Sequence, residues 1–198
     1  MYFESLTPLF LFALVSTVSP GGATTLATAS GANFGFRRSV PLIAGIATGL
    51  ASMAASVAVG LGGVLLALPS LQFVMKAAGS VYLLWLAWQL GRRGPPNTGM
   101  GTAKPTSFVM GAWMLWHNPK GWAMTVGAAA SFAALAEGPM RLALTLGAVL
   151  GLCAAASLSL WCTAGLILAR VLRTEIQWRA LNITLGLLLA VSILPVWL

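Results

Sequence analysis

The feature that most restricts the fold of this chain is a series of long apolar stretches that contain no charged residue. They cover residues 5–36, 39–75, 142–169 and 180–198. About 20 apolar residues let a helix cross the hydrocarbon core of a bilayer. These stretches, with two more that hold one charge each, supply six such spans. Only 7% of the 198 residues are charged, whereas a soluble domain has about 25%, so a soluble core is excluded.

The apolar stretches favour helices over a membrane barrel. Barrel strands read as segments of about 10 residues in which apolar and polar side chains alternate, and this alternation is missing here. We therefore predict an all-α integral membrane protein that forms a single transmembrane domain over residues 1–198. The six transmembrane helices are expected at roughly 5–30, 40–67, 70–90, 106–135, 142–169 and 179–198. The first is read as an uncleaved helix, because Glu4 stands where a signal peptide has basic residues.

The net charge of +8 comes mainly from the loops between the predicted spans. The odd-numbered connections carry eight basic residues, Arg37, Arg38, Arg92, Arg93, Lys104, Arg170, Arg173 and Arg179. The second connection has none, and the fourth has Arg141 beside Glu137. Because Lys and Arg concentrate in cytoplasmic loops, we expect the odd connections in the cytoplasm and both termini outside. The same clustering argues against nucleic acid as a partner.

The two halves of the chain resemble each other at an offset near 100 residues. The matching pairs are Ser19-Pro20-Gly21-Gly22 with Asn118-Pro119-Lys120-Gly121, Gly45-x-x-x-Gly49 with Gly147-x-x-x-Gly151, and Lys76-Ala77 with Arg179-Ala180. Three spans per half is an odd number, so the halves lie in opposite orientations, an inverted-topology repeat that is common among transporters. Repeat one covers about 1–92, a linker 93–105, and repeat two about 106–198. The alternative is that the matches reflect only the shared composition of membrane helices.

A proline interrupts the first span of each half. Proline removes a backbone donor and glycine loosens the helix, and backbone groups freed in lipid cost several kcal/mol unless protein or water satisfies them. Breaks at corresponding positions of two halves indicate a substrate site near the middle of the membrane. The residues expected to bind substrate there are Ser19, Pro20, Gly21, Gly22, Thr24, Asn118, Pro119 and Lys120. The alternative is a pair of structural kinks that neighbouring helices satisfy.

Lys120 is the charge that lies deepest in a predicted span, about 15 residues into the fourth. A charge at that depth costs at least about 2.5–3.5 kcal/mol on insertion scales, so its presence indicates a function. Lys120 could hold a substrate carboxylate or take part in proton coupling, or it could pair with freed helix carbonyls. His117, the only histidine, lies three residues earlier on what would be the same helix face. It is a second candidate for proton coupling, although a lone histidine is more often a hydrogen-bonded packing residue.

The remaining ionisable residues limit the substrate and the chemistry. Glu4, Glu137 and Glu175 lie near span ends or in loops, so no span interior offers a carboxylate to a cationic substrate. Cys153 and Cys162 are about 13 Å apart along one helix, too far for a disulfide. Clustered metal ligands are missing as well. We expect no metal, no cofactor and no enzyme, since an intramembrane enzyme or thiol relay would need a cluster that is not seen.

Three sequence elements make the chain resemble the LysE family of amino-acid exporters (LysE/RhtB-type translocators), which includes the homoserine and threonine efflux proteins. They are Ser19-Pro20-Gly21, the stretch KAAGSVYLLWLAW at 76–88, and Asn118-Pro119-Lys120-Gly121-Trp122. The resemblance implies a carrier of the bacterial inner membrane that exports an amino acid or related metabolite and is driven by the proton gradient. The family motif usually continues with Pro and then Asn or Asp, where this chain has Gly22 and Ala23.

The leading hypothesis is therefore an efflux carrier for a small zwitterionic amino acid or derivative, with Lys120 attracting the carboxylate. Its partners would be the lipid bilayer and this small molecule. The small-residue faces at Gly45/Gly49 and Gly147/Gly151 permit close helix packing, either within the chain or in a homo-oligomer. The alternative function is a membrane partner or assembly subunit that transports nothing itself.

Overall fold

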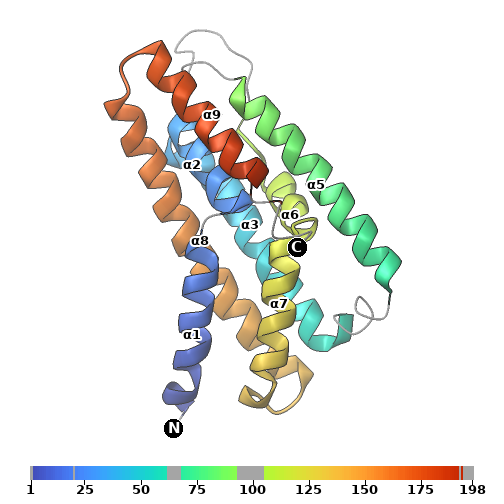
Figure 1. Ribbon diagram of the computed structural model, residues 1–198. Coiled ribbons are helices and arrows are strands. Elements are labelled where there is room, and N and C mark those ends of the chain that lie inside the picture. The colour runs from blue at the N-terminus through green and yellow to red at the C-terminus, as the bar shows by residue number, and fades with distance from the viewer. Residues whose placement is uncertain (1, 20, 62–67, 93–104, 192, 194–198) are drawn as a thin grey trace.

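The computed structural model describes the chain except for residues 1, 20, 62–67, 93–104, 192 and 194–198. The described part is helical and contains no strand, which confirms the all-α prediction for these residues. In chain order the elements are α1 (Tyr2–Val18), α2 (Gly22–Phe34), α3 (Phe36–Ser56), the π-helical turn η1 (Val57–Leu61), α5 (Pro69–Gly91), α6 (Phe108–Trp116), α7 (Pro119–Ser131), the 3-10 turn η2 (Ala133–Leu135), α8 (Pro139–Val171) and α9 (Glu175–Val191) (Figure 1).

Within the described residues, two helices are long and apolar enough to cross a membrane. They are Phe36–Gly60 and Pro139–Val171. A third candidate is the pair α1 and α2, which together are long and apolar enough for one span that is bent by 58° between Val18 and Gly22. These correspond to the predicted spans at 40–67, 142–169 and 5–30. The other three spans, where the structure has α5, α6 with α7, and α9, stay predictions.

The two interruptions that the sequence predicts both coincide with helix boundaries. The first separates α1 from α2 at residues 19–21, and the second separates α6 from α7 at residues 117–118. Pro20 lies outside the described residues, so its own conformation is not part of this finding. Each half of the chain thus begins with a broken helix.

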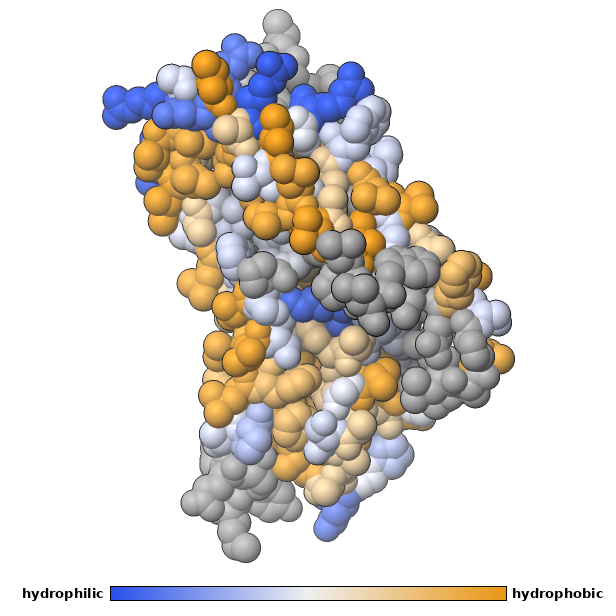
Figure 2. Space-filling model, viewed as in Figure 1, coloured by the Kyte–Doolittle hydropathy of each residue, from blue (hydrophilic) through white to orange (hydrophobic). Residues whose placement is uncertain are grey.

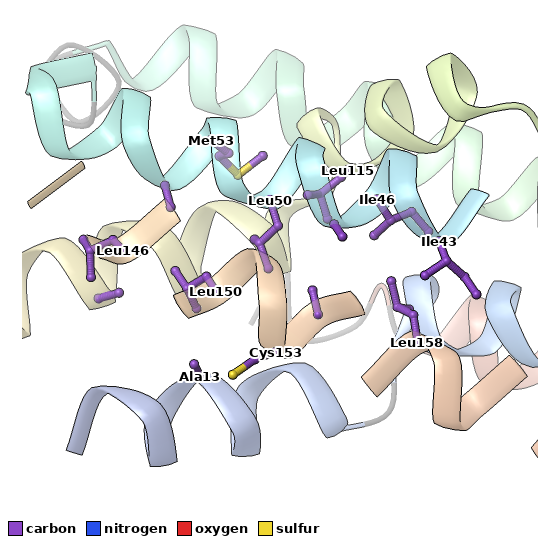
Figure 3. Close-up of a cluster of buried hydrophobic side chains, with 14 of the residues drawn as sticks. Ala13, Ile43, Ile46, Leu50, Met53, Leu115, Leu146, Leu150, Cys153 and Leu158 are labelled. Atoms are coloured by element: carbon purple, nitrogen blue, oxygen red, sulfur yellow. The ribbon is translucent and has the colours of Figure 1, made fainter. Parts of the chain in front are cut away.

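The core lies where α3 and α8 pack side by side, with α1, α2 and α6 around them (Figure 1). Figure 3 shows α3 side chains such as Ile46, Leu50 and Met53 facing Leu146 and Leu150 of α8, all of them buried. In lipid such apolar burial provides no hydrophobic gain, so close van der Waals packing holds the helices together. α5 and α9 form a second pair that packs mainly on itself and reaches α2 through α9.

Glycines let the central helices touch through their backbones. A Cβ added to Gly31 of α2 would collide with the Cys162 carbonyl of α8, and one added to Gly165 of α8 would collide with the Thr28 carbonyl of α2. A Cβ on Gly45 would likewise meet the Phe108 carbonyl of α6. Of the predicted small-residue faces, Gly45/Gly49 packs against α6 and Gly147/Gly151 against α3. Both faces are therefore used within the chain.

Apolar side chains cover much of the outer surface, as Figure 2 shows. Val109, Leu152 and Leu160 are 73%, 72% and 68% exposed. Apolar surface on this scale indicates contact with lipid rather than water. Hydrophilic side chains gather at the uppermost end of Figure 2, where the α2–α3 junction, the C-terminal end of α5 and the α8–α9 connection lie. In these segments, or in the helical turns next to them, lie Arg37, Arg38, Arg92, Arg170, Arg173 and Arg179.

Candidate functional site

The two helix breaks meet at Lys120. This residue lies in the first turn of α7 and is partly buried. Its Nζ donates hydrogen bonds to the carbonyl oxygen of Ser19 at 2.9 Å and to the Oγ of Ser19 at 2.7 Å. Ser19 directly follows α1 and is 101 positions away in the sequence. The fold therefore brings together the two motifs that the sequence pairs only by their similarity.

The orientation of the Ser19 hydroxyl is set by a local hydrogen bond. Its Oγ–H donates to the carbonyl oxygen of Ser16 at 2.9 Å. A hydroxyl has one proton and two lone pairs, so the Ser19 oxygen is left to accept from the ammonium group of Lys120. Ser19 thus presents two acceptor oxygens to the same cation.

Three successive carbonyls at the end of α1 receive a side-chain donor. The Oγ of Ser157 donates to Thr17 at 2.8 Å, and the Nε1 of Trp161 donates to Val18 at 3.1 Å. Lys120 completes the series at Ser19. A helix end leaves its last carbonyls without partners, and in lipid these must be satisfied by protein or water. α8 and α7 therefore stabilise the break, which is the arrangement that the structural-kink alternative requires.

Two of the predicted site residues form the starts of the helices that follow the breaks. Asn118 precedes α7, and its Oδ1 accepts from the backbone N–H of Lys120 at 3.0 Å, with Pro119 at the first helical position. Thr24 lies in the first turn of α2 and bonds back to Gly21, the residue before this helix. Its Oγ1 accepts from the Gly21 N–H and donates to the Gly21 carbonyl, both at 2.9 Å. Both side chains therefore stabilise the start of a helix, independently of any role in binding substrate.

Gly21 of the first motif lies against the side chain of Lys120. A Cβ on Gly21 would lie 3.4 Å from both Cδ and Nζ of Lys120, so this side chain occupies the space beside it. Gly22 is buried at the start of α2. The N-terminal ends of α2 and α7 thus lie at the same place, and a helix N-terminus favours a negatively charged group.

A cavity of about 40 Å³ lies among these groups. The polar side chains that line it are Ser16, Thr17, Ser19, Thr24, Asn118 and Lys120. The apolar side chains that line it include Ile46, Leu50, Leu115, Met124, Ala154 and Leu158, several of which Figure 3 shows. The described lining includes no Asp or Glu. The volume admits water but is far below the roughly 300 Å³ of small-molecule pockets, so the cavity is too small for an amino acid in this conformation.

His117 does not join Lys120 at this cavity. Its Nδ1 lies 2.9 Å from the Trp113 carbonyl oxygen and its ring centroid 4.0 Å from that of Trp113. It lines a separate apolar groove with Phe108 and Trp116. The expectation of one shared helix face is wrong, because the spacing of three residues applies only inside a continuous helix and α6 ends before His117.

Sequence reasoning missed the donors that α8 contributes. Ser157 and Trp161 are four residues apart, so they lie on one face of α8. That spacing was the available signal, but nothing in the sequence says which helix this face meets. Pro20 lies outside the described residues. Within the described part of the chain, no three His, Cys, Asp or Glu side chains are grouped closely enough to hold a metal ion.

Comparison with known proteins gives a consistent family. The model of the LysE type translocator family matches residues 14–192. The cysteine/O-acetylserine efflux protein of Escherichia coli (strain K12) is 27% identical over 188 residues, which is 93% of either chain. The protein of the same name from Shigella flexneri serotype 5b is 27% identical over 193 residues, 93% of this chain and 95% of the relative. No solved structure matches. The chain belongs to the LysE type translocator family.

Proposed function

We propose that the protein is an efflux carrier of the bacterial inner membrane that exports a small amino acid, or a derivative of one, with an uncharged side chain. The observation that carries this proposal is the convergence of Lys120 with both helix breaks at one cavity. Family membership supports transport, and relatives are named for the efflux of cysteine and O-acetylserine, two small amino acids without a charged side chain.

The chemistry of the cavity supports a zwitterion with its carboxylate at Lys120. The ammonium group and the N-terminal ends of α2 and α7 favour a negative charge at this point. The hydroxyls of Ser16 and Thr17 are acceptors within reach of an amino group. The rest of the described lining is mainly apolar and lacks a carboxylate, which disfavours a substrate with a cationic side chain.

We also propose that six spans form two inverted three-helix repeats, with the site on the axis that relates them. The packing partners support this, because α1 packs on α8 as α6 packs on α3, and α2 packs on α8 as α7 packs on α3. α5 and α9, the third helices of the two halves, pack on each other. Gly21 and Lys120, which the offset of 99 makes equivalent, lie in contact distance. Alternating access would then rock one repeat against the other around this point.

Coupling to the proton gradient is a further part of the proposal. Lys120 lies at the cavity, and His117 lies at the end of α6 beside a separate groove. Of these two candidates, Lys120 is better placed to couple proton movement to substrate, because it contacts the cavity itself.

A growth screen tests the function directly. A strain that lacks its amino-acid exporters is grown with and without the gene on inhibitory amounts of cysteine, O-acetylserine, homoserine, threonine, arginine and selected dipeptides. The proposal expects rescue by the gene on one or more small uncharged amino acids and none on arginine. Rescue on arginine alone would refute the proposed substrate class. Failure to rescue on any compound, with the protein present in the membrane, would favour a non-transporting assembly subunit.

A further inference from the structure

We propose that Ser19 competes with the substrate carboxylate for the ammonium group of Lys120, and so makes opening of the site depend on a ligand that carries a carboxylate. This inference rests on the proposed binding of substrate at Lys120. Ser19 would then select substrates by controlling when the site opens. The sequence suggests a different role, in which Ser19 contacts the substrate directly.

The geometry around the ammonium group supports the exchange. Two oxygens of one residue accept from the Nζ of Lys120 at 2.9 and 2.7 Å, the range of charge-assisted hydrogen bonds. A carboxylate would present two oxygens to the same group. Because the Ser19 hydroxyl donates to Ser16, its lone pairs are directed to the lysine without any rearrangement.

Because the cavity is small, Ser19 and a substrate carboxylate cannot both bind Lys120 at the same time. At about 40 Å³ it admits water but no amino acid while the contact between Lys120 and Ser19 persists. A substrate carboxylate can reach Lys120 only if α7 and the end of α1 separate. Binding and opening are therefore one event.

The cost of releasing Ser19 is limited by α8. The carbonyls of Thr17 and Val18 keep their donors Ser157 and Trp161, so the end of α1 stays supported. The Ser19 hydroxyl keeps its bond to Ser16. Among the described carbonyls at the end of α1, the Ser19 carbonyl is the one that needs a new partner, and water in an opened cavity supplies one. Hydrogen bonds between two ionised groups are stronger than those to neutral oxygens, so a carboxylate offsets this loss where a neutral amide does not.

Ser19→Ala removes the Oγ that accepts from the ammonium group of Lys120. The open form becomes more populated, and apparent affinity for substrate rises with the fraction of competent protein. One hydrogen bond to a charged group corresponds to about a tenfold shift. Direct binding of substrate by Ser19 predicts the opposite change, a loss of affinity.

The experiment measures how fast a charged methanethiosulfonate reagent labels a cysteine placed in the cavity wall. Ala154 lines the cavity and is 4% exposed, so Ala154→Cys is introduced in a Cys153→Ala, Cys162→Ala background. Intact cells and inverted vesicles present the two membrane faces. In this parent the expected labelling is slow, is accelerated by the amino acid that the growth screen identifies, and is unchanged by its carboxamide.

Ser19→Ala added to this parent should label about tenfold faster without substrate from at least one face. Ser19→Thr keeps the hydroxyl and should label at the parent rate. Ser159→Ala is the matched control and should also label at the parent rate, because it removes a half-buried hydroxyl that bonds within α8 to the Ala155 carbonyl and is absent from the described cavity lining. Both controls also show whether a serine change in these helices loosens the fold.

Labelling of Ser19→Ala at the parent rate, or equal acceleration by the carboxamide, would overturn the inference. If Ser19→Ala does not accumulate in the membrane, the comparison of amino acid with carboxamide on the parent decides alone. Failure of the proposed function has a different signature: no amino acid changes labelling in any variant, and the growth screen finds no export.

Discussion

Single residues of the two motifs start helices, line the cavity, or do both. Asn118 and Thr24 hold the first turns of α7 and α2 through side-chain oxygens. Lys120 extends from one of these turns to Ser19 and links the two halves of the chain. In the Asn-Pro-Lys sequence, Asn118 caps α7, Pro119 has the backbone angle that the first helical position requires, and Lys120 supplies the cation.

The capping role of Asn118 leads to a stability prediction. Asn118→Ala removes the acceptor of the Lys120 N–H and should cost about 1 kcal/mol, seen as a lower midpoint of thermal unfolding in detergent. Asn118→Ser keeps an oxygen at this position and should unfold close to the wild type. Equal midpoints for Asn118→Ala and the wild type would show that the cap contributes nothing to stability.

At the level of helices, the close approach of α2 to α8 determines where α1 ends relative to Ser157 and Trp161. Gly31 and Gly165 allow this approach, because any Cβ there would collide with a backbone carbonyl of the other helix. A carbonyl in a packed helix cannot rotate aside as a flexible side chain can. The donors for the break therefore depend on a contact more than one helical turn away from it.

Gly165→Ala tests this packing. Overpacking of a tight contact costs about 1–3 kcal/mol or more, so the variant should yield less monodisperse protein on size-exclusion chromatography and a lower unfolding midpoint. Gly127→Ala is the matched control, since it is also in a helix and a Cβ there meets nothing within 4 Å. Similar losses in both variants would mean that glycine in these helices matters for reasons other than contact.

The sequence was sufficient for features that depend on local chemistry. Both breaks could be predicted from proline and glycine, and the small-residue faces from their spacing, because these effects act within a few residues. The partners could not be predicted, since Ser157 and Trp161 meet α1 only through the tertiary packing. The position of His117 was missed because the break at 117–118 interrupts the helical spacing on which the expectation relied.

For the whole molecule, the distribution of charge predicts the orientation in the membrane. The α2–α3 junction and the α8–α9 connection lie at one end and carry most of the described arginines. Glu137 and Arg141 form an exposed pair at 3.6 Å beside the start of α8. Basic residues are retained on the cytoplasmic side, so the arginine-rich end should face the cytoplasm.

Single cysteines report this orientation. In the Cys153→Ala, Cys162→Ala background, Glu4→Cys and Glu137→Cys should react with a membrane-impermeant maleimide in intact spheroplasts. Arg173→Cys should react only after the cells are opened. Labelling of Arg173→Cys in intact spheroplasts, with Glu137→Cys protected, would reverse the orientation.

The central claim is that Lys120 binds the exported amino acid, and transport by purified protein in liposomes tests it most directly. Lys120→Ala should lower the initial rate of transport of the screened amino acid by about 30-fold or more, since loss of one partner of a buried charge pair costs about 2–5 kcal/mol. Lys76→Ala, which removes a lysine in the first half of the predicted span at 70–90, should transport as the wild type does. Wild-type transport by Lys120→Ala, reconstituted in the same amount, would contradict the account.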